Sequence, residues 1–290
     1  MCPPILETRE VHYAYGNAVP ALCGLDLRVD RGRRLALVGA NGAGKSTLLL
    51  HLNGLLKPTR GQVYIDGRPI DYGRHGLVEL RRRVGIVFQD PDDQLFSASV
   101  YQDISFGPMS LGLGEADVRA RVEEALSTMG VSDLRDRATH MLSFGQKKRV
   151  AIAGVLAMRP DVLILDEPTA GLDPSGVTDL LSLLDALHAS GTTLIAATHD
   201  MELAAEWADD VAVLHEGKVV RHGSPAAVLS DRDLMASAHL RLPRLFALGL
   251  LLQEHGIIEK GTALPRDLQA LAKMLTEAAS AATMCTTSRQ

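Results

Sequence analysis

The strongest constraint on this chain is its glycine-rich segment Gly39-Ala40-Asn41-Gly42-Ala43-Gly44-Lys45-Ser46. It fits the phosphate-loop pattern G-x-x-x-x-G-K-[ST], in which backbone amides line a concavity that holds phosphate groups. An apolar run at 35–38 precedes it and predicts a buried strand, and an apolar segment at 47–55 follows it and predicts a helix. The start of that helix adds unpaired amides and a positive dipole end. A glycine-rich turn without a ligand is the alternative, which this order of strand, loop and helix disfavours.

The side chains of the loop suit a nucleotide and its metal ion. Lys45 supplies a mobile cation for the β- and γ-phosphates, and Ser46 offers a hydroxyl to Mg²⁺. Thr47 can hydrogen-bond a phosphate oxygen. The sequence therefore predicts that ATP with Mg²⁺ is held by Asn41, Gly42, Gly44, Lys45, Ser46 and Thr47.

Composition excludes several classes of protein. The 290 residues suit one large domain or one domain plus an appendage, and the 46% hydrophobic content provides ample core. The net charge of −5 argues against nucleic acid as a partner, because such proteins carry a basic footprint. The three scattered cysteines suit a reducing compartment.

We expect neither a signal peptide nor a transmembrane helix. Pro3, Pro4 and Glu7 interrupt any apolar segment near the N-terminus. The longest apolar run, 245–252, is far shorter than the ~20 residues that a membrane span needs. Any role at a membrane therefore requires a partner.

The hydrophobic pattern predicts an α/β fold in which a helical segment interrupts a nucleotide-binding core. Alternating apolar residues over 5–35 and 62–67 predict an antiparallel sheet around the phosphate loop. Residues 90–160 predict a helical insert, with helices at 115–129 and 146–158. The rest of the core comprises predicted strands at 84–88, 162–165 and 193–197, predicted helices at 177–190 and 201–208, and a predicted hairpin at 211–220.

Two acidic residues follow the predicted strand at 162–165. Asp166 lies where a carboxylate can hold Mg²⁺ directly or through water. The adjacent Glu167 can polarise an attacking water. A solvated acidic loop is the alternative, and the upstream phosphate loop favours the catalytic interpretation because hydrolysis needs a metal ligand and a base.

A second helix start with anion-binding character lies in Leu142-Ser143-Phe144-Gly145-Gln146. Ser143 and Gly145 precede a helical pattern, so a free hydroxyl and free amides lie together there. Taken alone, an ordinary serine cap is the preferred explanation of this segment. The chain thus carries two helix starts that can each face a phosphate.

In their order along the chain, these motifs resemble the ATP-binding subunit of ABC transporters. The resemblance spans residues 39–199 and includes the phosphate loop, Gln89, the 142–146 signature, Asp166-Glu167, Ala170-Gly171-Leu172-Asp173 and His199. It implies a P-loop ABC nucleotide-binding domain over 1–228, with a RecA-like parallel sheet, an N-terminal antiparallel β subdomain and a helical subdomain. A small helical C-terminal extension over 229–290 follows.

The same resemblance implies a head-to-tail homodimer with ATP at the interface. Each ATP lies between Lys45 and Ser46 of one subunit and Ser143 and Gly145 of the other. Neither half is then a complete pocket. The signature residue Gln146 belongs to this nucleotide-binding set, and Asp173 acts across the dimer.

Further roles are implied by resemblance alone. Gln89 bridges Mg²⁺ or water and senses the nucleotide, and Asp166 supports Mg²⁺. Glu167 is the general base, and His199 contacts the γ-phosphate and stabilises developing charge. Tyr15 matches the aromatic residue that stacks on adenine, with Tyr13 as a competing candidate and strand packing as the alternative.

Two stretches narrow the resemblance to energy-coupling-factor importers, most closely the cobalt/nickel branch (CbiO or NikO type). They are 89–96 and 143–149, where Phe144 replaces the usual glycine. We expect an ATPase subunit, peripheral on the cytoplasmic face of the membrane, that powers cobalt or nickel uptake. Integral membrane coupling and substrate-binding subunits are the expected partners. No His/Cys cluster at ligand spacing is present, so the transported ion is expected to cross through those partners.

Two surface features are harder to interpret. Asp92 and Asp93 either receive arginines of the coupling subunit or form a solvated acidic turn. The apolar segment 242–255, and the stripe formed by Leu268, Leu271, Ala272 and Leu275, pack on their own subunit or on the dimer mate; we favour a dimer-stabilising role.

Other functions remain open from the sequence. The main alternative is the ATPase of another importer, for a vitamin, an amino acid or another small solute. A soluble ABC ATPase acting on ribosomes or DNA lacks support, because the sequence shows no second cassette and no basic arm. A nucleotide-gated subunit without turnover is disfavoured by the presence of Glu167 and His199.

Overall fold

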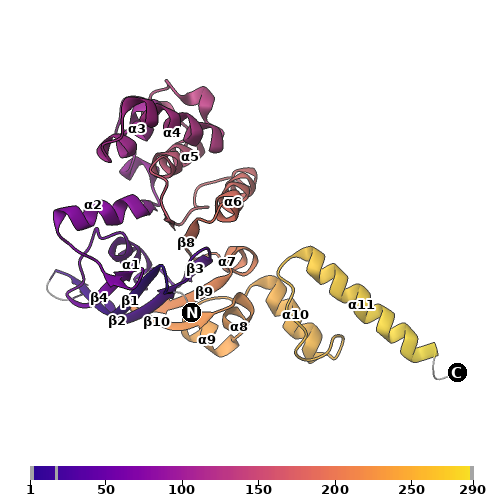
Figure 1. The fold of residues 1–290 in the computed structure, drawn as a ribbon. Helices are drawn as coiled ribbons and strands as arrows, with labels where there is room; N and C mark the ends of the chain where they lie inside the picture. Colours follow the sequence, from indigo (N-terminus) through magenta and orange to yellow (C-terminus); the bar gives the residue numbers. More distant parts are fainter. Residues whose placement is uncertain (1–2, 17–18, 288–290) are drawn as a thin grey trace.

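The computed structural model describes residues 3–16 and 19–287, with side chains described to residue 280. Two sheets and a helical subdomain make up its body, and a helical extension leaves one side (Figure 1). The four-stranded antiparallel sheet has the order β2-β1-β4-β5. Its strands are β1 (Leu6–Tyr15), β2 (Val19–Val29), β4 (Arg60–Ile65) and β5 (Arg68–Pro69).

The six-stranded sheet has the order β10-β9-β3-β8-β7-β6, and only β10 runs antiparallel to its neighbour. Its central strands are continuous apolar runs because both faces are covered. Its strands are β3 (Arg34–Val38), β6 (Val84–Val87), β7 (Val162–Asp166), β8 (Thr193–Thr198), β9 (Asp210–His215) and β10 (Lys218–Gly223).

Alternate residues of the parallel strands face two different hydrophobic cores. Ala36 and Val38 of β3 face a core shared with the helical subdomain. Leu35 and Leu37 face a core shared with the antiparallel sheet and the helix after the phosphate loop. The six-stranded sheet thereby fixes the phosphate loop relative to both subdomains.

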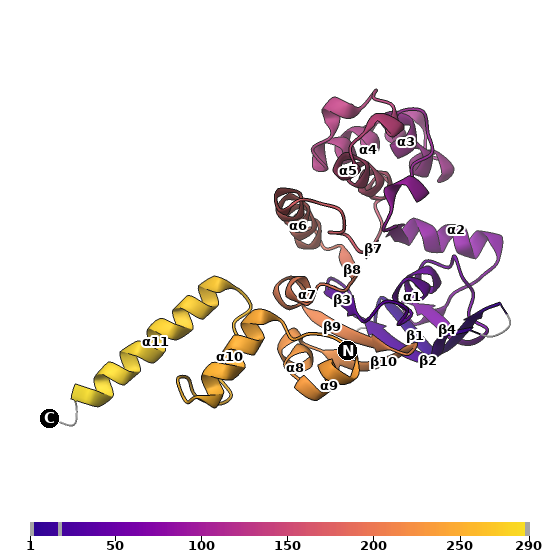
Figure 2. The same cartoon turned by 180° about the vertical axis from the view of Figure 1, so that it is seen from behind.

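The helices fall into three groups along the chain. Those of the helical subdomain stand at the end of the molecule away from the antiparallel sheet (Figures 1 and 2). The core contains α1 (Lys45–Leu52), α2 (Arg74–Arg83), α6 (Pro174–Ala189) and α7 (Met201–Trp207); the helical subdomain contains α3 (Val100–Ser110), α4 (Glu115–Thr128) and α5 (Phe144–Leu156); α8 (Pro225–Leu229), α9 (Arg232–Ser237), α10 (Arg244–Glu254) and α11 (Leu268–Thr287) follow the core.

The predicted fold class is confirmed: a parallel core, an antiparallel sheet and a helical insert are all present. The predicted hairpin at 211–220 forms, and the chain also turns at Asp66 to pair β4 with β5; Asp66 and Glu216 both adopt left-handed backbone angles. The signature helix begins at Phe144, two residues before the predicted start, because Ser143 caps it. In the same way Asp173 caps α6, which begins at Pro174 and not at 177.

The C-terminal extension is anchored before it departs. Met235 and Phe246 are fully buried and belong to the core shared with the helical subdomain. Beyond them α11 projects away from the body (Figures 1 and 2). The domain boundary at 228 stays a prediction, and residues on its far side contribute to the main core.

Candidate functional site

The phosphate loop joins the end of β3 to the start of α1. Gly44 precedes α1 with a φ of 106°. A Cβ at this position would lie 2.6 Å from the carbonyl oxygen of Ala21, so only glycine fits both the angle and the space. Nζ of Lys45 donates to the carbonyl oxygens of Gly39 (2.7 Å) and Ala40 (3.3 Å). The loop thus holds its cation against its own backbone.

A partly buried carboxylate, that of Asp166, faces this cation from the end of β7. Burial raises the pKa of Asp166, while a hydrogen bond from Ser46 lowers it. Burial lowers the pKa of Lys45, and the carboxylates of Glu167 and Asp166 oppose that shift. Opposite charges within one partly desolvated site therefore stabilise each other's ionised forms.

Glu167 and His199 directly follow the neighbouring strands β7 and β8, and they meet at the carboxyl ends of these strands. Nδ1 of His199 lies 2.9 Å from Oε1 of Glu167. The glutamate is buried, whereas the histidine side chain is 68% exposed. This contact fixes the carboxylate and leaves the imidazole open to a ligand.

The two candidate aromatic residues of β1 occupy different places. Tyr13 packs edge to face against His51, with ring centroids 4.8 Å apart. Tyr15 is partly exposed, and its hydroxyl lies 3.3 Å from Oγ1 of Thr47. Tyr15 is therefore the one of the two tyrosines that lies on the cavity described next.

One cavity of about 580 Å³ collects the first part of the predicted site. Its remaining wall comes from Val19, Pro20 and Ala21 of β2, which the sequence analysis did not single out. The predicted site residues that line it are Tyr15, Asn41, Gly42, Gly44, Lys45, Ser46, Thr47, Gln89, Asp166, Glu167 and His199.

A second cavity of about 540 Å³ collects the rest. Ser143 caps α5 by accepting a hydrogen bond from the amide of Gln146, and the Gln146 side chain accepts one from the Ser143 amide. Gly145 lies on the same cavity, as does Asp173, whose carboxylate caps α6. One chain therefore carries the predicted site as two halves on two cavities.

The donor groups in the first cavity fit Mg²⁺. The Asp166 carboxylate, the Ser46 hydroxyl and the Gln89 amide are hard oxygen donors, the type that Mg²⁺ prefers. No group of three or more histidine, cysteine, aspartate or glutamate side chains arranged to hold a metal ion occurs among the described residues.

Sequence analysis missed Lys148. Its side chain is 1% exposed, and Nζ donates to the carbonyl oxygens of Glu167 (2.9 Å) and Ala170 (3.2 Å). The signal was a lysine on the apolar face of α5, at helical spacing from Ala151, Ile152 and Val155, all of which are buried. A cation in such a position needs buried acceptors.

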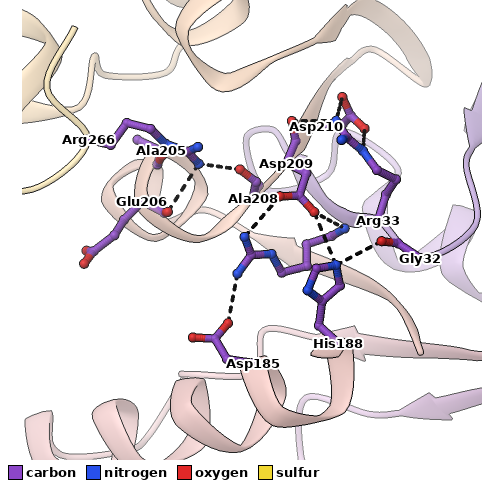
Figure 3. A network of polar contacts seen from close by, with 11 residues as sticks. Gly32, Arg33, Asp185, His188, Ala205, Glu206, Ala208, Asp209, Asp210 and Arg266 are labelled. Atoms are coloured by element: carbon purple, nitrogen blue, oxygen red, sulfur yellow. Dashed lines mark hydrogen bonds and ion pairs between the residues drawn. The ribbon is translucent and has the colours of Figure 1, made fainter. Parts of the chain in front are cut away.

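A polar network ties the far end of β3 to α6 and to the extension (Figure 3). Arg34 bridges Asp185 of α6 and Asp209 before β9, at 2.9 and 3.0 Å. Arg266 of the extension donates to the backbone carbonyls of Ala205, Glu206 and Ala208 at the end of α7.

Within residues 3–16 and 19–287, no helix combines the length and apolar character needed to cross a membrane.

Residues 22–170 match the ABC transporter family. The chain is 54% identical over 272 residues to the cobalt import ATP-binding protein CbiO of Rhodobacter capsulatus, covering 94% of this chain and 97% of that protein. It is 50% identical over 251 residues to the energy-coupling factor transporter ATP-binding protein EcfA3 of Clostridium perfringens, covering 86% and 88%.

Solved structures agree with the sequence relatives. CbiO1 from Clostridium perfringens, part of the ABC transporter complex CbiONQ, superposes with a TM-score of 0.73 at 50% identity, covering 85% of this chain and 98% of that one. A dimeric ATP-binding cassette bound to ADP and phosphate after hydrolysis superposes with a TM-score of 0.69 at 28% identity, covering 76% and 98%. The chain belongs to the ABC transporter family, as an ATP-binding subunit of energy-coupling-factor type whose ATP hydrolysis is coupled to transport.

Proposed function

We propose that two copies of this chain clasp two ATP molecules and hydrolyse them to power the uptake of a transition-metal ion, cobalt or nickel. The observation that carries the dimer is the division of the predicted site between two cavities of one subunit. A related cassette is dimeric with ADP and phosphate bound, which supports the same arrangement here.

Within each ATP site of the dimer, the first cavity binds the nucleotide. Tyr15 stacks on adenine, the loop amides at Asn41, Gly42 and Gly44 hold the phosphates, and Lys45 neutralises the β- and γ-phosphates. Thr47 adds a hydroxyl donor. The partner subunit closes the site with Ser143, Gly145 and Gln146, and Asp173 lies across the interface.

Hydrolysis requires a base and a stabiliser of charge. Glu167, held by Nδ1 of His199, accepts a proton from the attacking water, and His199 contacts the γ-phosphate. Ser46, Gln89 and Asp166 would hold Mg²⁺, which supplies neutralisation of phosphate charge when bound.

Replacing Glu167 with glutamine should lower the rate of ATP hydrolysis about 10²- to 10⁴-fold, because the amide cannot accept the proton. A phosphate-release assay measures this. The matched control is Glu216→Gln, since Glu216 shares a left-handed backbone angle but is exposed in a hairpin turn. Full turnover by Glu167→Gln would refute the assignment of the base.

The proposed solute is inferred from the relatives of the chain. The name of the Rhodobacter capsulatus relative supports cobalt, whereas the EcfA names leave room for a vitamin or another small solute. Co-purification with the membrane subunits, followed by uptake assays for cobalt and nickel, tests it. Uptake of neither metal, with ATP-dependent uptake of another solute, would favour the second function.

The membrane partners would dock on the surface that follows Gln89, on the cytoplasmic face of the membrane. Asp93 is exposed, and Asp92 pairs with Lys147 at 2.6 Å. Phe96 and Phe106 lie beside one another as exposed rings, with centroids 4.9 Å apart. An arginine-bearing helix suits this acidic and aromatic surface. Charge reversal of both aspartates should abolish assembly of the complex, and unchanged assembly and transport would remove this docking site.

A further inference from the structure

Lys148 connects the signature helix to the loop that carries the proposed base. Its ammonium lies in the protein interior, and its hydrogen bonds to the carbonyl oxygens of Glu167 and Ala170 span the loop 167–171 that follows β7. The carboxylates of Glu167 and Asp166 add electrostatic attraction. A buried charge with these acceptors fixes the loop more firmly than a neutral donor would.

The backbone at Glu167 needs such support. Its φ of 45° lies in the left-handed region, which a glutamate rarely adopts. Its amide donates to Ala197 of β8 at 2.9 Å, and its carbonyl accepts from the amide of Ala170 as well as from Lys148. The direction of the Glu167 side chain therefore depends on contacts from outside its own strand.

Phe144, one helical turn before Lys148 on α5, contacts both this lysine and the loop 167–171. Nζ of Lys148 lies 5.6 Å from the centroid of the Phe144 ring, within cation–π range. The ring also covers Gly171, where φ is 74° and a Cβ would lie 2.6 Å from the aromatic carbons. Helix α5 thus holds the loop 167–171 near both of its ends.

We propose that Lys148, seated against Phe144, is a positioning residue that couples the two ATP sites of the dimer. The start of α5 presents Ser143 and Gly145 to the ATP bound by the partner, and Lys148 lies one turn further along the same helix. Engagement of the partner's ATP at the helix start thereby sets the orientation of Glu167 in the subunit's own cavity. The inference rests on the proposed function, since it acts through Glu167 as the base.

The test replaces the cation while keeping the shape of the side chain. In the full-length protein, Lys148→Met should lower kcat about 10- to 100-fold, as expected for a displaced catalytic group, with KM for ATP changed less than about threefold. Lys148→Arg, which keeps the charge and the donors, should recover most of the rate. The control Lys57→Met removes an exposed lysine that lines neither cavity and should match the wild type.

A double variant separates positioning from a structural role. If Lys148 acts through Glu167, adding Lys148→Met to Glu167→Gln should leave the residual rate unchanged. A further multiplicative loss would overturn the proposal, as would wild-type kcat in Lys148→Met alone. Should Lys148→Met fail to fold, Lys148→Gln, which keeps a neutral donor, should show the same selective loss of kcat, and its absence counts against the proposal.

The outcomes also separate this inference from the proposed base. Full turnover by Glu167→Gln refutes both. Loss of turnover in Glu167→Gln with full turnover in Lys148→Met refutes the coupling alone.

Discussion

At the scale of single residues, burying the charged side chain of Lys148 costs free energy of folding. The stability of the fold therefore does not explain why this residue is a lysine. Burial lowers its pKa from 10.5 to about 8, even though Glu167, Asp166 and Asp90 oppose the shift. A shift of that size corresponds to a cost of about 3 kcal/mol for keeping the ammonium charged at pH 7. A side chain held charged at such a cost fits a functional role for α5.

The lowered pKa of Lys148 predicts that the free energy of unfolding depends on pH. Between pH 8 and 10.5 the unfolded chain binds a proton at Lys148 that the folded protein has released, so the free energy of unfolding rises with pH. Below pH 8 both states are protonated and the dependence vanishes. Urea unfolding of the wild type and of Lys148→Met from pH 7 to 10, followed by Trp207 fluorescence, should show the wild type gaining stability relative to the variant only above pH 8. Parallel curves would contradict this.

The sequence predicted the site residues that stand at fixed spacing within a motif. Lys45 and Asp166 stand at fixed places in their motifs, and the structure brings both to one cavity with Glu167 and His199. Lys148 was not predictable, because its acceptors are backbone carbonyls of a loop that lies near α5 only through the packing of the helical subdomain on the core.

At the scale of elements, α7 connects the end of β8, which His199 follows, to the C-terminal extension. It begins two residues after His199, and Glu202 in its first turn accepts a hydrogen bond from the amide of Arg244 at 2.8 Å. Arg266 caps its last turn through three carbonyls (Figure 3). A cation at a helix C-terminus satisfies carbonyls that would otherwise lack partners.

Removing this cap should destabilise the fold. Arg266→Gln should lower the free energy of unfolding by about 2 kcal/mol, the range for hydrogen bonds to a charged group. Chemical unfolding measures it. Arg244→Gln is the matched control, because that guanidinium is 93% exposed and should change little. If Arg266→Gln lowered the free energy of unfolding no more than Arg244→Gln does, the cap would contribute nothing to stability.

Most elements were predictable from periodicity, and their ends were not. Apolar runs predicted the strands β3, β7 and β8, and an apolar stripe at helical spacing predicted the helix α4. Helix starts shifted by two or three residues because Ser143 and Asp173 act as caps, and capping depends on a few side-chain hydrogen bonds that a hydrophobic pattern does not record.

At the scale of the whole molecule, the extension divides into an anchored part and a projecting part. Met235 and Phe246 belong to the main core, so a cut near residue 230 would expose it. On α11, Leu268 and Leu275 are exposed. A second copy of the chain is the occupant that we propose for this helix, in line with a dimer-stabilising role.

A cut after residue 267 tests that role without opening the core. The shortened protein should keep its fold and form a dimer at least about tenfold weaker, since apolar area is lost from the interface. Analytical ultracentrifugation without ATP measures the dimer constant. An unchanged dissociation constant of the dimer would show that α11 does not stabilise the dimer. The partner of α11 was beyond sequence reasoning, because an apolar stripe does not identify what covers it.

The central claim is that each ATP is cleaved only between two subunits, and mixing two defective variants tests it most directly. Lys45→Met disables the first cavity and Ser143→Arg disables the second, so each protein alone should lack ATPase activity. Mixed in equal amounts after both are shown to fold, they should regain about a quarter of the wild-type rate, because half of the dimers then contain one intact site. Ser143→Arg turning over ATP by itself at the wild-type rate would contradict the account.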